Sequence, residues 1–466
     1  MEITPYINKN NKEPIYSQIY SYVKREIESG RLSSGSKLPS IRQLSQYLKV
    51  SKNTIEEAYH QLIAEGYAES RPKSGIFVSP VEDIINPKQP LTLEPMKYSI
   101  ELTKKTFKYD FQYGDIDITG FPMKKWRKHL NEALDLMDSD SFNYGDKQGD
   151  AELRKQIALY LYRSRGVTCN QEQIVITSGT QQSISLLIKL LSLREEMIGF
   201  EDPGYDGVRS IFSHENCKIS PIPLQHDGMD IASLVNGTRA VYVTPSHQFP
   251  MGMILSIQKR KKLLNWAYQT GGYIIEDDYD GEFRYQGMPI PPLKALDEGE
   301  KVIYLGTFSK CFLPSARLSY MVLPPELSLK CKKEEQLPHQ NVSTIIQKAA
   351  SSFMATGEFE SHIRKMRKIY HGKHRTLLSS IENYMGNKVE VIGEKAGLHI
   401  LLKVKNRKDF ELIEAAGLKG VKVYSASAYL VNDVINKDAT IMLGFGGLSE
   451  DDIESGIRLL HEAWFI

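Results

Sequence analysis

The sequence predicts an α/β protein in which a small helical unit precedes a large domain with a mostly parallel sheet. Residues 13–79 are dense in helix signals, and residues 80–106 hold four prolines among polar and charged residues. From about residue 107, short apolar runs alternate with amphipathic segments, as in strands joined by helices. We therefore expect a first domain at 13–79, a linker at 80–106 and a second domain at 107–466, with a smaller α+β subdomain from about residue 340.

Length and composition are those of an ordinary multidomain protein. The chain has 466 residues, of which 41% are hydrophobic and 25% charged, and its net charge is +2. Residues 1–80 hold eleven Lys/Arg and eight Glu, whereas the other 386 residues hold 48 basic and 49 acidic side chains. A basic N-terminal unit is a mild indication of contact with nucleic acid, although a surplus of this size is also common by chance.

Cysteine spacing and hydropathy argue against a metal site and a membrane span. Cys169, Cys217, Cys311 and Cys331 show no metal-ligand spacing and are expected to be reduced thiols. The polar N-terminus lacks the apolar core of a signal peptide. The most apolar helix-like run, Ile184–Leu193, is too short to span a bilayer. We expect a cytoplasmic protein without a membrane contact.

Three helices are predicted in the N-terminal unit. Pro14–Ser29 has the apolar spacing of an amphipathic helix. Ser40 and Gln43 match a capping box at the start of the next helix. Lys49–Val50 then make a short turn, and Ser51 caps the third helix. This order is that of a helix-turn-helix.

The third helix and the segment that follows it carry the candidate DNA contacts. Ile55, Ala58, Leu62 and Ile63 are expected to face inward, and the opposite side or the N-terminal end is expected to present Lys52, Asn53, Thr54 and Tyr59 to major-groove bases. Residues 68–80 are predicted to form a hairpin, and its tip carries Arg71, Lys73 and Gly75. A basic tip with glycine can approach the phosphate backbone closely. The alternative is a small helical domain with solvated charges.

These residues resemble a known DNA-binding module. The run LPSIRQLSQYLKVSKNTIEEAYHQLIAEGY, followed by a P-x-S-G-x-F/Y-V wing, is similar to the GntR-type winged helix-turn-helix. The resemblance implies that the partner is double-stranded operator DNA. It also implies contacts to DNA from Ser40, Arg42, Ser51, Lys52, Asn53, Thr54, Arg71, Lys73 and Gly75.

The large domain contains six clear strand candidates. They are Gln173–Thr177, Met197–Glu201, Ala240–Thr244, Tyr273–Glu276, Lys301–Gly306 and Leu318–Leu323. Two lysine-rich helices are expected within 343–385, before the C-terminal subdomain.

Polar groups follow several of these strands. Lys310 in GTFSK comes just after an apolar strand, where ligands of open α/β sheets bind. A lysine flanked by Thr307 and Ser309 suits an imine with an aldehyde cofactor beside a phosphate, to which Arg317 can add a charged fork.

Two further strand ends supply complementary chemistry. Asp277 ends the strand at 273–276, and a carboxylate there can keep a pyridine nitrogen protonated. Ser178–Gln182 lies between a strand and a helix, where backbone N–H groups can hold a phosphate. Each feature alone is usually a turn, a solvated cluster or ordinary surface. What favours a cofactor site is their order along the chain, in which a phosphate-binding turn is followed by an aspartate at a strand end and then by a lysine at a strand end.

Longer motifs extend the resemblance to most of the chain. They are FPMKKWRK, YGDKQGDAELRKQIALYLYRSRGV, TSGTQQ, EDPGYDG, TPSHQFPMG, IIEDDYDGEF and LGTFSKCFLPSARLSYMVLP. These resemble the fold-type I pyridoxal phosphate-dependent aminotransferases. More closely, the chain resembles the MocR/GabR-type regulators, which join a GntR-type winged helix-turn-helix to such an aminotransferase-like domain.

The resemblance implies pyridoxal 5'-phosphate as the cofactor and assigns roles to individual residues. Lys310 would form the imine, Asp277 would hold the pyridine nitrogen and Tyr279 would bond to the phenolic oxygen. Tyr205 would flank the ring, although core packing is the alternative for both tyrosines. The phosphate would be surrounded by Gly179, Thr180, Gln181, Thr307, Ser309 and Arg317. Ser246 and His247 are expected at the same mouth.

The chain departs from the family where relatives bind a carboxylate. Members that sense γ-aminobutyrate use two arginines, and the corresponding positions here are Gly207 and Gly447. The arginine of true aminotransferases also has no counterpart in ATIMLGF. Arg209 or Arg165 could substitute from a neighbouring turn or from the partner subunit, but bidentate recognition of a carboxylate is hard to replace without arginine. We therefore expect neither γ-aminobutyrate as effector nor rapid aminotransferase turnover.

The sequence as a whole predicts a ligand-responsive transcription regulator rather than an enzyme. The expected effector is an amine, an amino acid or the cofactor itself. The resemblance implies a head-to-tail homodimer, which suits paired half-sites on DNA. The alternative is an active aminotransferase with an accessory DNA-binding domain.

Overall fold

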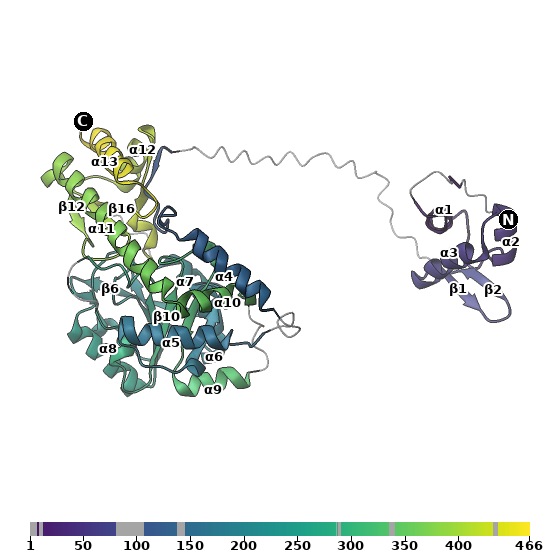
Figure 1. The fold of residues 1–466 in the computed structure, drawn as a ribbon, viewed down its shortest axis with the longest axis horizontal. Helices are drawn as coiled ribbons and strands as arrows, with labels where there is room; N and C mark the ends of the chain where they lie inside the picture. Colours follow the sequence, from purple (N-terminus) through teal and green to yellow (C-terminus); the bar gives the residue numbers. More distant parts are fainter. Residues whose placement is uncertain are drawn as a thin grey trace. The chain divides into compact units, whose positions relative to one another are not determined.

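The chain forms two compact units, Met1–Thr103 and Lys104–Ile466. The computed structural model describes residues 7–8, 13–80, 107–137, 145–285, 287, 290–334, 341–431 and 437–466 (Figure 1). Most of the predicted linker, residues 81–106, lies outside the described residues. Among the described residues, no helix combines the length and the apolarity that a membrane crossing requires.

The first unit is a helix-turn-helix with a wing, as predicted. Its helices are α1 (Ile15–Glu28), α2 (Ile41–Leu48) and α3 (Lys52–Ala64), and its antiparallel wing strands are β1 (Ala68–Arg71) and β2 (Gly75–Val78). The Ser40 hydroxyl accepts a hydrogen bond from the Gln43 backbone N–H, and the Ser51 hydroxyl accepts one from Thr54. Both serines therefore cap helices, as their spacing predicts.

An eight-stranded sheet forms the centre of the second unit. Its strand order is β4-β11-β10-β9-β8-β5-β6-β7. The bounds are β4 (Ile174–Thr177), β5 (Met197–Asp202), β6 (Lys218–Gln225), β7 (Gly228–Met229), β8 (Thr238–Val243), β9 (Tyr273–Asp278), β10 (Val302–Thr307) and β11 (Ser319–Val322). Neighbouring strands from β10 to β6 run parallel, whereas β11 and β7 pair antiparallel with their neighbours. The carboxyl ends of the parallel strands therefore share one edge.

Helices cover both faces of this sheet. One face packs against α6 (Thr180–Leu191) and α7 (Asp206–His214), and Ile275 and Ile303 point toward them. The opposite face, with Ile274 and Val302, packs against α8 (Ile257–Thr270). On that same side lie α5 (Ala151–Arg165) and α10 (Thr344–Ala355). The alternation along β9 and β10 follows from the two-residue period of a strand. Residues 274–275 of β9 and 302–305 of β10 are all apolar or aromatic because both faces of these strands are buried.

A smaller antiparallel sheet follows α11 (Glu358–Tyr384), the long green helix in Figure 1. Its strand order is β12-β13-β16-β15, with bounds β12 (Glu390–Ile392), β13 (His399–Val404), β15 (Tyr424–Ser425) and β16 (Ala439–Gly444). The remaining α-helices and strands of the described residues are α4 (Met123–Asp135), α9 (Pro325–Lys333), α12 (Asp409–Leu418), α13 (Glu450–Phe465) and the parallel pair β3 (Tyr109–Asp110) with β14 (Val421–Lys422). This confirms the predicted C-terminal α+β subdomain.

Arg260 on α8 is hydrogen-bonded to the loops that lie at the carboxyl edge of the large sheet. Its side chain is 2% exposed, and its three nitrogens donate to the carbonyl oxygens of Leu255 (2.8 Å), Pro291 (2.7 Å) and Pro245 (2.7 Å). Pro245 directly precedes the predicted site residue Ser246. A single buried guanidinium therefore fixes the backbone that leads into the site.

We expect Arg260→Ala to lower the free energy of unfolding by about 3 kcal/mol or more, because three buried carbonyls lose their donor and a cavity remains. Urea unfolding of the full chain would measure this loss. The matched control is Lys261→Ala, one residue along on the exposed side of α8, which is expected to change stability by less than about 0.5 kcal/mol. Equal effects of the two substitutions would contradict a structural role for Arg260.

Candidate functional site

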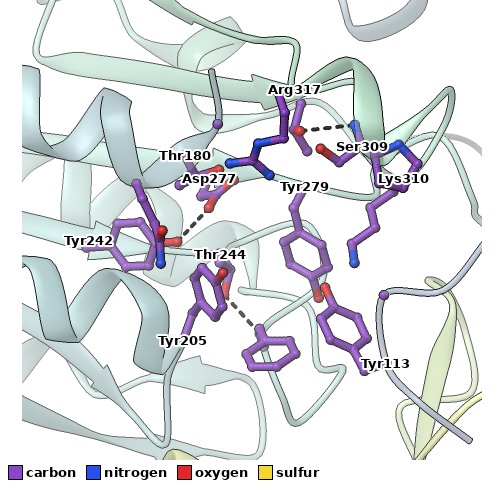
Figure 2. A pocket seen from close by; sticks show the side chains of 16 residues that line it. Tyr113, Thr180, Tyr205, Tyr242, Thr244, Asp277, Tyr279, Ser309, Lys310 and Arg317 are labelled. Carbon is purple, nitrogen blue, oxygen red and sulfur yellow. Dashed lines mark hydrogen bonds between the residues drawn. The ribbon is translucent and has the colours of Figure 1, made fainter. Parts of the chain in front are cut away.

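A cavity of about 290 Å³ lies at the carboxyl edge of the large sheet. The ends of β4, β8, β9 and β10 meet there because these strands are aligned in the sheet. Its lining consists of Tyr113, Gly114, Gly179, Thr180, Gln181, Tyr205, Tyr242, Thr244, Phe249, Asp277, Tyr279, Thr307, Ser309, Lys310, Pro314 and Arg317. Figure 2 shows the Lys310 amine pointing toward Tyr279 and Tyr113.

Lys310 presents an amine that is poised to be neutral. It follows β10 by three residues, and its Nζ lies 4.1 Å from the centroid of the Tyr113 ring. Burial lowers the pKa of Lys310 to about 8, although the carboxylates of Asp280, Asp115 and Asp277 act in the opposite direction. A neutral amine is the nucleophile that captures an aldehyde, so the lowered pKa makes Lys310 more reactive near neutral pH than an ordinary lysine.

Asp277 on β9 has one carboxylate oxygen in a hydrogen bond and one without a hydrogen-bond partner among the described residues. Its Oδ2 accepts a hydrogen bond of 2.6 Å from the Tyr242 hydroxyl on β8, whereas Oδ1 is buried and has no partner among the described residues. Burial raises the pKa of Asp277 to about 7, and the Tyr242 bond opposes that change. An N–H group in the cavity would satisfy Oδ1 and favour the ionised carboxylate.

The end of the cavity near α6 can hold an anion. Gly179 precedes α6 with a φ of 134° and no side-chain cap, so the first N–H groups of the helix are available. A Cβ at this position would lie 2.7 Å from Arg317 Nη2, which explains why glycine is needed for the close approach. Thr180, Thr307 and Ser309 add hydroxyl groups to the same lining. Together they match a phosphate in charge and hydrogen-bonding capacity.

Two tyrosines complete the middle of the cavity. Tyr205, just before α7, meets Phe249 edge-on at 5.7 Å between ring centroids. Tyr279 lies after β9, and its hydroxyl is 2.9 Å from the His247 carbonyl oxygen. A flat ring between Tyr205 and the sheet edge would place its polar substituents near Lys310, Asp277 and Tyr279.

The structure separates the predicted cofactor residues into two groups. All of them except Ser246 and His247 line the cavity. His247 lies behind Tyr279, and the Ser246 hydroxyl accepts a 3.1 Å hydrogen bond from Arg165. Neither of these two residues reaches the lining, because both turn toward a second, smaller cavity beside Arg165 and Asp280.

Several lining residues were not predicted from the sequence. These are Tyr113, Gly114, Tyr242, Thr244, Phe249 and Pro314. Tyr242 could have been found, because its alternation along β8 places it on the side of Asp277. Tyr113 has no local signal, since it reaches Lys310 from almost 200 residues earlier in the chain.

The two arginines proposed as substitutes do not line the cavity. Arg209 donates to the Tyr429 carbonyl oxygen at 2.9 Å. Arg165 is buried and donates from Nε to Asp278 at 2.8 Å. A Cβ on Gly447 would lie 2.8 Å from the Asp115 Cβ, so that position is also too crowded for a side chain without a shift. Among the described residues, the lining has Arg317 as its one arginine.

The predicted DNA-contacting residues lie largely on the surface of the first unit. Exposed residues are Ser40, Arg42, Ser51, Lys52, Asn53, Arg71, Lys73 and Gly75, and Thr54 is half-buried. Within the unit, Ser40 and Ser51 act as helix caps. Arg71 pairs with Glu69 at 2.6 Å.

Tyr59 does not face outward from α3, and its predicted contact with DNA is wrong. Its side chain is 0% exposed and its hydroxyl donates to the Pro39 carbonyl oxygen at 2.9 Å. The reason is helical periodicity, because Tyr59 follows Ile55 by four residues and precedes Leu62 by three. Tyr59 is therefore a core residue of the first unit and is removed from the DNA-facing set.

Two family models match the chain. Residues 15–78 match "Bacterial regulatory proteins, gntR family", and residues 109–434 match "Aminotransferase class I and II". The chain is 43% identical over 470 residues to the HTH-type transcriptional regulator YhdI of Bacillus subtilis, covering 100% of this chain and 98% of that protein. It is 28% identical to the probable rhizopine catabolism regulatory protein MocR of Rhizobium meliloti, covering 98% and 95%.

A solved aminotransferase shares the architecture of the large unit. The Pyrococcus horikoshii kynurenine aminotransferase, solved in complex with PMP, superposes with a TM-score of 0.69 and 27% identity. The alignment covers 82% of this chain and 96% of that one.

The lowered pKa of Lys310 predicts its labelling behaviour. In protein prepared without cofactor, the rate at which an amine reagent modifies Lys310 is expected to rise with pH to a midpoint near 8 and then level off. An ordinary lysine, with a pKa of about 10.4, continues to gain reactivity beyond pH 10. Peptide mass spectrometry after brief labelling would give the profile. In Asp277→Asn the midpoint should move lower, because an opposing negative charge is lost, and a profile like that of ordinary lysines would refute the argument.

Proposed function

This chain belongs to the MocR-type HTH transcription regulators, and we propose that it binds pyridoxal 5'-phosphate at Lys310 and responds there to an effector. The effector would be an amine, an amino acid or the cofactor itself. The partner would be double-stranded operator DNA, bound through α3 and the wing.

One observation carries the cofactor proposal: the cavity offers a complementary group for each polar part of this cofactor. Lys310 supplies an amine for the aldehyde. Asp277 Oδ1, which has no hydrogen-bond partner among the residues that the structure describes, suits a pyridine N–H. Arg317 and the start of α6 suit the phosphate, and the Tyr279 hydroxyl suits the phenolic oxygen. When bound, the cofactor would supply a reactive carbonyl and an electron-withdrawing ring. Lys310 would hold it, and Asp277 would keep its ring nitrogen protonated.

Regulation would follow from two conformational states with different affinities for the effector. A ligand shifts such an equilibrium only by the difference between its affinities for the two states. Winged helices on paired half-sites require two copies of the chain. We therefore propose a head-to-tail homodimer in which effector binding changes how the two DNA-binding units engage the operator.

The side chains that line the cavity limit the kinds of effector that it can bind. An amino-acid carboxylate is normally held by a bidentate arginine. Arg317 lies against Gly179 at the phosphate end, and neither Arg165 nor Arg209 reaches the cavity. This supports an effector that is anchored mainly through its amine, and it weighs against γ-aminobutyrate.

An active aminotransferase is the second candidate function. The likeness to solved aminotransferases and the lowered pKa of Lys310 both favour it. It differs from a sensor in one measurable respect, because it consumes a 2-oxo acid over many cycles.

Visible absorption of the purified protein would separate the two functions. With pyridoxal phosphate added, we expect a band that Lys310→Ala abolishes while DNA binding is at least partly retained. A panel of amino acids, amines and D-alanyl peptides is then added. One compound is expected to shift the band without consuming 2-oxo acid. Repeated cycling with loss of 2-oxo acid would establish an aminotransferase instead, and a band retained in Lys310→Ala would refute the lysine assignment.

DNA binding should depend on the basic surface of the first unit. We expect Arg42→Ala or Lys52→Ala to weaken operator binding and to reduce the slope of log K against log[salt] by about one per lost phosphate contact. A salt titration measures this slope. Tyr59→Phe is the control, because its hydroxyl faces Pro39, and its slope should equal that of the wild type. An unchanged slope in both alanine variants would exclude those contacts.

A further inference from the structure

A chain of buried polar groups lies behind Tyr279. The His247 Nδ1 is 3.0 Å from the Tyr279 hydroxyl and 2.9 Å from Asp280 Oδ2. The exposed fractions of Tyr279, His247 and Asp280 are 8%, 2% and 3%. Hydrogen bonds among these groups are therefore shielded from water, and each proton has few possible positions.

Asp280 determines which nitrogen of His247 carries the proton. An ionised carboxylate only accepts hydrogen bonds, so Nδ1 must donate to Oδ2. Nε2 is then a bare acceptor, and it has no partner among the described residues. The opposite tautomer would set the Nδ1 lone pair against the carboxylate and bury an Nε2–H donor without an acceptor. The Nδ1–H tautomer is thus the favoured one.

This tautomer limits where Tyr279 can send its own proton. Because Nδ1 already donates to Asp280, it cannot accept from the Tyr279 hydroxyl. Within the part of the chain that the structure describes, the remaining acceptor bonded to this hydroxyl is the His247 carbonyl oxygen, at 2.9 Å. A charged oxygen in the cavity forms a stronger hydrogen bond than a carbonyl and would compete successfully for this donor.

We propose that Asp280 and His247 are a positioning pair that keeps the Tyr279 hydroxyl available to donate to the phenolic oxygen of the cofactor. This inference rests on the cofactor part of the proposed function. Neither His247 nor Asp280 lines the cavity, so both act through Tyr279.

The surrounding ionisable groups are compatible with this arrangement. His399 on β13 packs against His247 with 5.1 Å between ring centroids, and its Nε2 donates to the Pro250 carbonyl oxygen. Burial lowers the pKa of His399 to about 3, so this ring stays neutral. On the other side, Arg165 is paired with Asp278, and Arg284 lines the same small cavity as His247. Lys310 and Asp277 face Tyr279 from the cofactor side.

His247, Asp280 and His399 also have the composition of a metal site, since one ligand atom from each lies within 4.8 Å of the others. The distances favour a hydrogen bond. Two ligand atoms bound tetrahedrally to one zinc ion at about 2.1 Å would be separated by ~3.4 Å. The Nδ1–Oδ2 separation is 2.9 Å, and His399 Nε2 is occupied by a carbonyl.

The pH midpoint of the visible band of the bound cofactor tests the pair. The pH midpoint reports loss of the proton shared by the imine nitrogen and the phenolic oxygen. A hydrogen-bond donor to the phenolic oxygen stabilises the resulting anion and lowers the midpoint, so loss of this donor raises it. In Asp280→Asn no carboxylate fixes the Nδ1–H tautomer. The ring can then carry its proton on Nε2, and the Nδ1 lone pair, 3.0 Å away, accepts the Tyr279 proton. We expect the midpoint to rise by about one to two pH units, as for loss of one hydrogen bond to a charged acceptor. Tyr279→Phe should show a similar rise.

A double-mutant cycle distinguishes positioning from general disturbance. In a Tyr279→Phe background, Asp280→Asn should no longer raise the midpoint, because the hydroxyl that it controls is absent. Loss of the Asp280 charge, which favours the protonated Lys310 nitrogen, should leave only a lowering. The matched control is Asp297→Asn. The Asp297 side chain is 0% exposed and accepts from the Val302 N–H at the opposite end of β10, so its midpoint should equal that of the wild type. An unchanged or lowered midpoint in Asp280→Asn, or a rise that persists without the Tyr279 hydroxyl, would overturn the proposal.

The tautomer can also be measured without cofactor. Nitrogen NMR of histidine-labelled protein, with the signal assigned through His247→Gln, is expected to show Nδ1–H in the wild type and Nε2–H in Asp280→Asn. An Nε2–H ring in the wild type would overturn the proposal whether or not the cofactor binds. A wild-type protein that shows no visible band with pyridoxal phosphate would refute the proposed function, and the role of the pair toward the cofactor with it.

Discussion

Burial of ionisable groups at the carboxyl ends of β9 and β10 constrains the rest of the large unit. Removing a charge from water is costly, so a lysine and an aspartate in this position tend toward their neutral forms. The pKa of Lys310 falls to about 8 and that of Asp277 rises to about 7. A ligand with an aldehyde and a basic ring nitrogen reverses part of this cost, because it consumes the amine and gives the carboxylate a charged partner.

Neighbouring buried groups hold this edge in place. Glu201 accepts hydrogen bonds from the Thr244 N–H and hydroxyl groups, and the Thr244 hydroxyl in turn accepts from the Phe249 N–H at 3.0 Å. Arg260 donates a hydrogen bond to the Pro245 carbonyl oxygen, and Asp280 is hydrogen-bonded to His247. The segment between β8 and α8 is thus fixed at several points. A cavity wall fixed in this way needs little rearrangement to accept a ligand.

The sequence could predict whatever depends on periodicity or on strand ends. Ser40 and Ser51 marked the helix starts, and the strand before Lys310 placed this lysine at the ligand-binding edge. The direction in which individual side chains point was harder to predict from the sequence. Tyr59 was assigned to the outside although its spacing from Ile55 and Leu62 indicated the core. The motif that contains His247 predicted that this residue lies near the site, but it did not show that the ring contacts Tyr279 on the side away from the cavity. Tyr113 reaches the site through a long-range contact that no local pattern encodes.

Capture of an amine and completion of transamination make different demands on this cavity. Capture of an amine by an aldehyde cofactor would need only that the incoming amine replace Lys310 in the imine, and that a carboxylate such as Asp277 lie beside the ring nitrogen. Turnover also needs the substrate to be held at a second point, because the bond that breaks must be aligned with the ring. Among the described residues, the one arginine of the lining lies against Gly179 near the start of α6. A ligand anchored mainly through its amine could therefore change the balance between two protein states without being held in a reactive orientation, which is what a sensor requires.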